Sequence, residues 1–217
     1  MRVLILGSTG RIGGAALTAA LDRGLDVVAL VRSETTPPVD AGVHYVIGDV
    51  RDAAAIQTAM KGVDAVIAAL GPRSNAAGEE AALEDGMRTL MKVMERQGTG
   101  RLVALSGAGV DVPGDHKPFL DRVMSKIVRL AVRHVVGAKQ REFDLLAASR
   151  LAWTALRPPL VSDGPARGYR LDLRLQPGAR VTRADVGQAL VDQLDDGTYV
   201  RAAPFVLPVR REYPAQP

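Results

Sequence analysis

The fold of this chain is decided by the stretch VLILGSTGRIG, which occupies residues 3–13. Four apolar residues open it, three glycines (Gly7, Gly10 and Gly13) follow, and a helical pattern over residues 11–23 continues from its end. The order strand, tight turn, helix brings the unpaired N–H groups of a helix N-terminus to the turn, where they can bind a phosphate. The first glycine permits the sharp turn, the second lets the backbone approach a pyrophosphate, and the third lets the helix lie close to the strand. We therefore expect a dinucleotide cradle here and not merely a structural turn.

Short apolar runs alternate with longer helical patterns along the rest of the chain. This alternation is typical of βαβ units around a mainly parallel sheet, so we expect one α/β domain over residues 1–217, doubly wound and Rossmann-like, with helices flanking the sheet. The expected strands are residues 3–6, 26–31, 44–47, 65–68, 102–105 and 153–156, with short later strands at 169–173 and 205–207. The expected helices are residues 11–23, 53–61, 79–97, 119–148 and 183–195, with Gly24 after the first and Gly137 as a candidate break in the fourth. Substrate loops are expected mainly in 106–118 and 158–180.

The composition excludes several classes of site. Cysteine is absent, which rules out disulfides, thiolate metal sites and thiol catalysis. The three scattered histidines, His44, His116 and His134, argue against a zinc site, so none is expected. The formal net charge of +4 suits a polyphosphate ligand but does not argue for nucleic acid. No apolar run approaches a signal-peptide core or the ~18 residues of a membrane span, so a cytoplasmic location without a membrane partner is expected. The expected partner is a small-molecule substrate, with the chain monomeric or homodimeric.

Residue 32 indicates which dinucleotide is bound. NAD-selective proteins carry an acidic residue about 20 residues past the glycine turn. Here Val31 is followed by Arg32, whose guanidinium can grip a 2′-phosphate, and Arg11 in the turn is a second candidate for the same phosphate. NADP(H) is therefore favoured over NAD. The alternative is that both arginines are solvated surface residues, partly offset by Glu34.

The glycine spacing and the later strand ends carry a family resemblance. The turn reads Gly-x-x-Gly-x-x-Gly instead of the Gly-x-Gly-x-x-Gly of most dehydrogenases. The strand ends read Gly48-Asp49-Val50, Ala68-Ala69-Leu70-Gly71, Ser106, and Leu156-Arg157-Pro158-Pro159. Together these resemble atypical short-chain dehydrogenases/reductases, in the NAD(P)H-binding group that includes biliverdin reductase B (flavin reductase) and NmrA-like proteins.

The resemblance implies roles for these positions. Asp49 would meet the adenine, Ala69 with Gly71 would border the adenosine ribose, and Pro158 to Leu160 would meet the nicotinamide carboxamide. Asp49 could instead cap the helix that begins near Ala53. Arg157 is expected to order its loop. The candidate cofactor-binding residues, from the turn and the resemblance together, are Gly7, Thr9, Gly10, Arg11, Ile12, Gly13, Arg32, Asp49, Val50, Ala69, Gly71, Pro158 and Leu160.

The catalytic residues are incomplete by comparison with the family. Its members that act on alcohols and ketones carry a Tyr-x-x-x-Lys pair, and here Lys139 is preceded at that spacing by Val135, which has no proton to give. Lys139 would hold the nicotinamide ribose and Ser106 would bond a substrate carbonyl; the alternatives are a surface helix lysine and a locally satisfied hydroxyl. His134 could replace the missing acid or be merely packed.

Two functions remain open from the sequence. The first is an NADPH-dependent oxidoreductase that passes hydride to a conjugated acceptor such as a flavin or quinone, which needs mainly proximity and orientation from the protein. Leu160 stands where biliverdin reductase B carries a histidine, which argues against bilin-specific chemistry. The second is a non-catalytic NADP(H)-binding redox sensor, NmrA-like, which Val135 favours.

A basic stripe suggests a third and weaker function. Its members recur at helical spacing and could dock on nucleic acid, although a solvated helix face is the better interpretation. They are Arg122, Lys126, Arg129 and Arg133.

Overall fold

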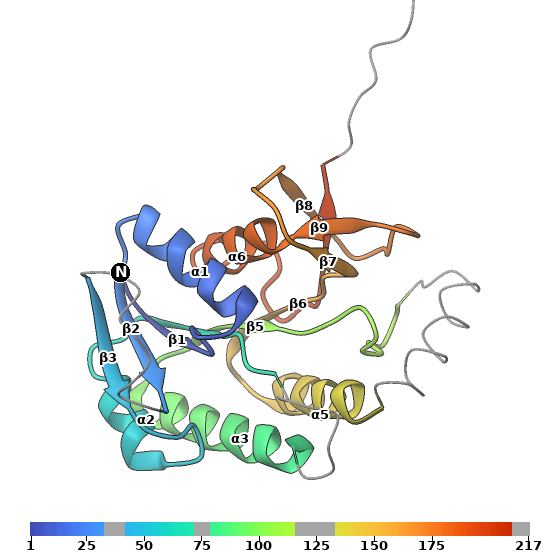
Figure 1. Cartoon of the computed structure of the whole chain (residues 1–217). Helices are drawn as coiled ribbons and strands as arrows, with labels where there is room; N and C mark the ends of the chain where they lie inside the picture. The colour runs from blue at the N-terminus through green and yellow to red at the C-terminus, as the bar shows by residue number, and fades with distance from the viewer. Residues whose placement is uncertain (33–41, 72–78, 116–132, 210–217) are drawn as a thin grey trace, which may run out of the picture.

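A parallel sheet forms the centre of the molecule (Figure 1). The computed structural model describes residues 1–32, 42–71, 79–115 and 133–209. The six-stranded sheet has the order β3-β2-β1-β4-β5-β6, and each neighbouring pair is parallel. Its strands are β1 Arg2–Leu6, β2 Asp26–Val31, β3 Val43–Ile47, β4 Ala65–Ala68, β5 Arg101–Leu105 and β6 Ala152–Leu156. The chain runs outward from β1 to β3 and then returns to β4, so the strand order reverses between β1 and β4. In open α/β sheets ligands bind at such a switch point, beyond the carboxyl ends of the strands.

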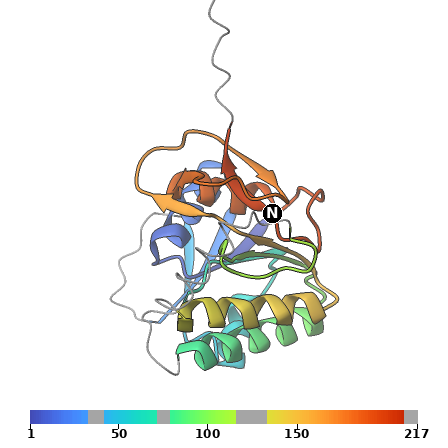
Figure 2. The same cartoon turned by 90° about the vertical axis from the view of Figure 1, so that its right-hand side faces the viewer.

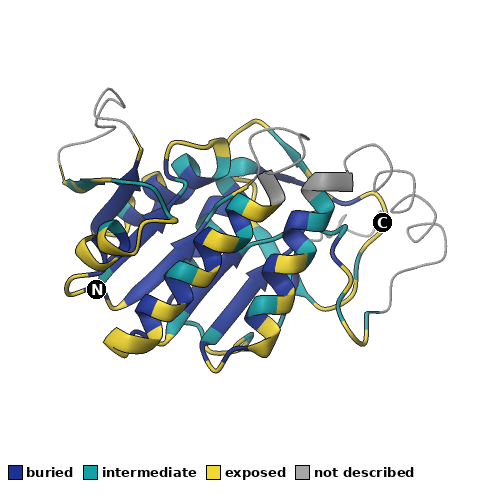
Figure 3. Ribbon diagram, turned by 90° about the horizontal axis from the view of Figure 1, so that it is seen from below, coloured by how far each residue is buried: buried dark blue, intermediate teal, exposed yellow. Residues whose placement is uncertain are grey.

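Helices cover both faces of the sheet, as Figure 2 shows from the side. One face carries α1 (Arg11–Asp22) and α6 (Arg183–Asp192), and the other carries α2 (Ala53–Ala59), α3 (Glu79–Gln97) and α5 (Arg133–Ala148). Alternate residues of β1 enter opposite cores: Leu4 packs among residues of α2 and α3, whereas Ile5 packs among residues of α1 and α6. Both are fully buried. Figure 3 shows the second face, with exposed residues on the outer sides of its helices and buried strands behind them.

Four shorter strands make two small sheets beside α6. They are β7 Leu160–Ser162, β8 Tyr169–Asp172, β9 Arg180–Thr182 and β10 Phe205–Pro208. β10 pairs antiparallel with β8, and β7 pairs parallel with β9. The predicted α/β fold is confirmed, as are the strands near 169 and 205, but β7 and β9 were not expected. The candidate break at Gly137 is wrong, because α5 runs through it, and residues 119–132 of that predicted helix lie outside the described residues.

Helices α1 and α6 approach each other at a glycine. A Cβ added to Gly187 would lie 2.6 Å from the carbonyl carbon of Ala15. Exchange of Gly187 for alanine is expected to lower the free energy of unfolding by about 1–3 kcal/mol, because the backbone of α1 at Ala15 cannot move away from the new methyl group without disturbing the helix. Urea denaturation measures this. Gly197→Ala is the control, since among the described residues no atom beyond its chain neighbours lies within 4 Å of its Cβ position; equal stability of the two variants would contradict the prediction.

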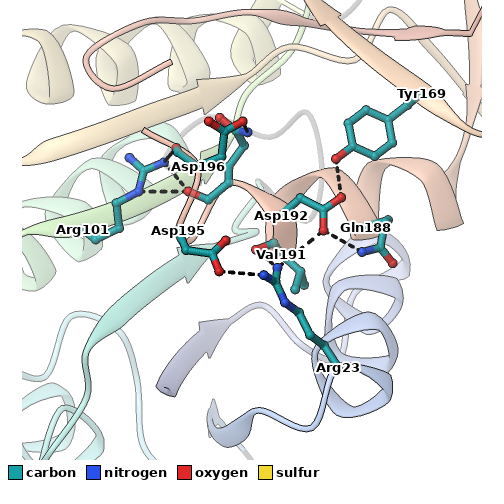
Figure 4. Close-up of polar contacts among 9 residues, drawn as sticks. Arg23, Arg101, Tyr169, Gln188, Val191, Asp192, Asp195 and Asp196 are labelled. Atoms are coloured by element: carbon teal, nitrogen blue, oxygen red, sulfur yellow. Dashed lines mark hydrogen bonds and ion pairs between the residues drawn. The ribbon is translucent and has the colours of Figure 1, made fainter. Parts of the chain in front are cut away.

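Arginines tie the amino-terminal end of the sheet to the end of α6 (Figure 4). Arg23 donates to the carbonyl of Val191 at 3.3 Å and to Asp195 at 2.6 Å. Arg101 opens β5, and its Nε donates to the carbonyl of Gln193 at 3.0 Å. Cations are favoured at a helix C-terminus, where carbonyls lack helical partners. This network lies at the opposite end of the sheet from the carboxyl ends of the strands, so it holds the scaffold and leaves the switch point clear.

None of the helices within the described ranges combines the length and apolar character that crossing a membrane requires.

Candidate functional site

The glycine turn has the geometry that its sequence predicts. Gly7 follows β1 with a φ of +80°, and a Cβ there would lie 2.5 Å from the carbonyl oxygen of Ala69. A Cβ on Gly13 would collide with the carbonyl of Gly7. Gly10 donates its N–H to the Gly7 carbonyl at 2.9 Å and is the N-cap of α1, without a side-chain cap. The first and third glycines are therefore required by close approach of backbone, and the first turn of α1 has N–H groups that can meet an anion.

Two adjoining cavities open at the switch point. The first has a volume of about 450 Å³ and lies between the glycine turn and the ends of β2 and β3. The second has a volume of about 440 Å³ and reaches the ends of β4 and β5 and helix α5. Gly10 and residues 69–71 line both. The first cavity contains these predicted cofactor residues: Gly7, Thr9, Gly10, Arg32, Asp49, Val50, Ala69 and Gly71. The second contains Gly10, Arg11, Ile12, Gly13, Ala69 and Gly71, together with Ser106 and Lys139.

The loop after β6 is not brought to either cavity. Pro158 is buried, and its carbonyl accepts from Ala108 N–H at 3.3 Å. Leu160 begins β7 with 51% of its surface exposed. Neither residue lines the two cavities, so contact of Pro158 or Leu160 with a nicotinamide stays a prediction from the resemblance.

The first cavity carries an ion pair that sequence reasoning missed. The guanidinium of Arg51 donates to both carboxylate oxygens of Asp49, at 2.8 and 3.0 Å, and its backbone N–H adds a third bond at 2.9 Å. The hydrogen bond from the Arg51 side chain lowers the pKa of Asp49. Asp49 does not cap α2, because Asp52 accepts from Ala54 N–H at 2.8 Å in that role. The alternative interpretation of Asp49 as the helix cap is therefore wrong.

The arginines are distributed differently from the expectation. Arg32 and Arg51 line the first cavity, whereas Arg11 lines the second. Arg51 could have been noticed from its position two residues after Asp49, in the loop that follows β3. The structure thus places Arg51, and not Arg11, beside Arg32 in one cavity.

Ser106 lines the second cavity immediately after β5. Its N–H donates to the carbonyl of Leu156 at 2.8 Å, which fixes the backbone. Its Oγ is buried and has no hydrogen-bond partner among the residues that the structure describes. Buried polar atoms normally have a partner. The alternative of a locally satisfied hydroxyl is therefore not supported, and a molecule in the cavity could provide the missing hydrogen-bond partner.

Lys139 is buried, so its interpretation as a surface helix lysine is wrong. Its Nζ donates to the carbonyls of Leu70 and Leu105, at 2.6 and 2.5 Å, and to Glu142 Oε2 at 2.6 Å. Glu142 is also buried; burial raises the pKa of its carboxyl, and the Lys139 charge opposes that shift. Sequence reasoning missed Glu142, although its spacing of three from Lys139 puts both on one helix face.

The side chain of Arg157 holds the loop after β5, whereas the sequence predicted that it orders its own loop after β6, and that role stays a prediction. It is 1% exposed, and its guanidinium donates to both carboxylate oxygens of Asp115 at 2.6 and 2.8 Å. It also donates to the carbonyl of Ala203 at 2.7 Å and lies 3.9 Å from the centroid of the Phe205 ring. One buried cation thus joins the end of β6, the loop containing Asp115, and β10.

Some predicted residues fall outside the described parts of the chain. His134 and Val135 belong to the first turn of α5, but their side chains lie outside the description. The basic stripe lies there too: Arg122, Lys126 and Arg129 are outside the described residues, as is the side chain of Arg133.

Comparisons with known proteins agree with this geometry. A family model described as NAD(P)H-binding matches residues 7–197. An uncharacterized protein of Mycobacterium tuberculosis is 27% identical over 127 residues, which make up 58% of this chain and 13% of that protein. The chain therefore spans only a small part of the length of that curated relative.

Solved structures share the fold. ChuY, an anaerobillin reductase from Escherichia coli O157:H7, has a TM-score of 0.79 at 20% identity, covering 98% of this chain and 100% of that one. A short-chain dehydrogenase/reductase from Veillonella parvula, solved in complex with NADP, has a TM-score of 0.77 at 21% identity, covering 98% and 96% of the two chains. At these identities the likeness concerns the fold alone.

Proposed function

The chain belongs to this NAD(P)H-binding family, and we propose that it is an NADPH-dependent reductase that passes a hydride to a conjugated small-molecule acceptor such as a flavin or quinone. The observation that carries the proposal is the pair of adjoining cavities, which meet at Gly10 and residues 69–71. Arginines and a carboxylate line the first, and apolar residues and glycines make up most of the second. This arrangement suits a dinucleotide whose adenosine half occupies the first cavity and whose reactive ring reaches the second.

The residues of the turn and of the first cavity fit NADPH. Among the described residues beyond its chain neighbours, the Gly7 carbonyl oxygen at 3.2 Å is the one atom within 4 Å of the Cβ position of Gly10, so bare backbone would face a pyrophosphate there. Arg32 and Arg51 would hold the 2′-phosphate by charge-assisted hydrogen bonds. When bound, NADPH supplies the hydride, and the residues of the chain hold and orient the reactants.

The second cavity fits a flat acceptor. Its walls include Ile12, Leu105, Val110 and Val136, which would pack against a ring and exclude water from it. The Ser106 hydroxyl would donate to a carbonyl oxygen or ring nitrogen of the acceptor. One hydride and one proton reduce a quinone to a quinol, and the proton can come from water. Such an acceptor therefore tolerates valine at position 135.

Oxidation of NADPH tests the proposal directly. The loss of absorbance from NADPH is followed with the purified protein against separate panels of flavins, quinones, and simple ketones and aldehydes. Turnover with members of the first two panels and little with the third is expected. Preference for ketones would contradict the proposed acceptor class, and no oxidation with any panel would contradict catalysis.

Exchange of Ser106 for alanine is expected to lower kcat/KM for the acceptor about tenfold, because one hydrogen bond to the reacting group is lost. The Kd for NADPH should stay within about twofold, and the unfolding free energy should not fall, because the hydroxyl has no partner in the described protein. Steady-state kinetics and calorimetry measure these quantities. Equal loss of NADPH affinity would place Ser106 on the cofactor instead.

A non-catalytic redox sensor is the second candidate. It is favoured by Val135 at the tyrosine position and by the three internal hydrogen bonds of Lys139. Tight binding of both NADP and NADPH without oxidation across all panels, together with a partner affinity that differs between the two forms, would support the sensor and reject the reductase.

A further inference from the structure

The ammonium of Lys139 lies between two strands beyond the point where they stop pairing. The register of β4 with β5 ends at Ala68 opposite Ala104. Past that point, the carbonyls of Leu70 and Leu105 accept hydrogen bonds from the same Nζ, at 2.6 and 2.5 Å. One side chain from α5 therefore bridges the carboxyl ends of both strands.

The third donor of the ammonium is also used inside the protein. A lysine Nζ has three N–H groups and no acceptor capacity. Glu142 Oε2 accepts the third bond at 2.6 Å and supplies the opposite charge, which a buried cation requires. With three acceptors this close, a ribose hydroxyl could bind Nζ only by displacing one of them.

We infer that Lys139 and Glu142 form a positioning pair that sets the spacing of the β4 and β5 ends, and that neither side chain binds the dinucleotide. The inference rests on the proposed cofactor binding. Leu70 and Gly71 line both cavities, and Ser106, directly after Leu105, lines the second. Because the pair holds both carbonyls, its removal should disturb both halves of the site, including the half that binds adenosine. A lysine that bonded only the nicotinamide ribose would leave the adenosine half unaffected.

A double variant separates positioning from direct contact. Lys139→Met with Glu142→Met removes one positive and one negative charge, so the net charge and its attraction for phosphates are unchanged. Calorimetry then measures the Kd of NADP and of adenosine 2′,5′-bisphosphate, which lacks the nicotinamide riboside. Positioning predicts that both affinities fall, each by roughly tenfold. Loss of NADP affinity with unchanged bisphosphate affinity would overturn the inference, as would no loss for either ligand.

The matched control is Arg141→Met, which removes a half-exposed cation from the same helix. Its affinities for both ligands should stay within about twofold of the original protein. If the original protein binds neither ligand, the proposed function fails, whereas the burial and internal bonding of Lys139 are still tested by a measurement that needs no variant.

That measurement is lysine acetylation of the unaltered protein, read by mass spectrometry with and without NADP. Lys61 and Lys92 are exposed and should be modified in both samples. Lys139 should remain unmodified in both, because its ammonium is buried and fully bonded. If Lys139 were acetylated in the free protein but protected when NADP is present, a ribose contact would be shown. That result would overturn the inference even if the double variant did not fold.

Discussion

Exchange of Arg32 for aspartate is expected to reverse the dinucleotide preference from NADP to NAD. Arg32 is exposed at the end of β2 and lines the first cavity, where a guanidinium would bond the 2′-phosphate and a carboxylate would repel it. A carboxylate at this strand end can also accept hydrogen bonds from the ribose hydroxyls of NAD. Loss of a charge-assisted bond and gain of repulsion should change the ratio of the two Kd values by about 100-fold or more. Calorimetric titration of both dinucleotides measures it.

The matched control for this change is Arg11→Asp. Arg11 is exposed and carries the same charge, but it lines the second cavity. Its exchange should weaken both dinucleotides by similar factors and leave their ratio unchanged. If Arg11→Asp changed the ratio as much as Arg32→Asp, both arginines would serve one phosphate, as the sequence alone suggested. An unchanged ratio in Arg32→Asp would reject the NADP assignment.

Sequence patterns predicted the central fold well, because buried parallel strands leave continuous apolar runs between helical patterns. Residues 3–6 and 65–68 were placed correctly on that basis. The three-residue strands β7 and β9 were missed, since each lies near prolines and glycines and is too short for a periodic signal. The candidate break at Gly137 is absent because packing of α5 on the sheet outweighs the low helix propensity of one glycine.

The site was only partly predictable for a related reason. Its glycines and Arg32 could be predicted, because the glycines lie between a strand and a helix that are adjacent in sequence and Arg32 directly follows a predicted strand. The spacing of Glu142 from Lys139 indicated a shared helix face, but the burial of that pair could not be recognised, since a carboxylate in a helix is usually exposed. Arg51 lies only two residues after Asp49, so a contact between them could have been expected, but the sequence does not show that both side chains face the first cavity.

Replacing Arg157 by methionine is expected to cause the largest loss of stability. The variant keeps much of the packing volume but leaves the Asp115 carboxylate without the two bonds that it accepts from the guanidinium. The Asp115 side chain is 12% exposed, so water can replace these bonds only in part. Breaking a buried ion pair from one side costs about 3–5 kcal/mol. Urea denaturation measures the loss, and Arg88→Met, which breaks a partly exposed pair with Glu84, should cost less than about 1 kcal/mol.

The double variant Arg157→Met with Asp115→Leu tests the reason for that loss. If the cost arises from a largely buried carboxylate that has lost the two hydrogen bonds of the guanidinium, removal of Asp115 should restore a substantial part of the stability, because replacing both members of a buried pair by apolar residues is often nearly neutral. Residues 107, 109 and 110, in the loop that Arg157 ties to β6 and β10, line the second cavity. The double variant should therefore fold, yet show a higher KM for the acceptor while its Kd for NADPH stays nearly unchanged. A double variant no more stable than Arg157→Met would instead assign the loss to the Phe205 stacking and the Ala203 hydrogen bond.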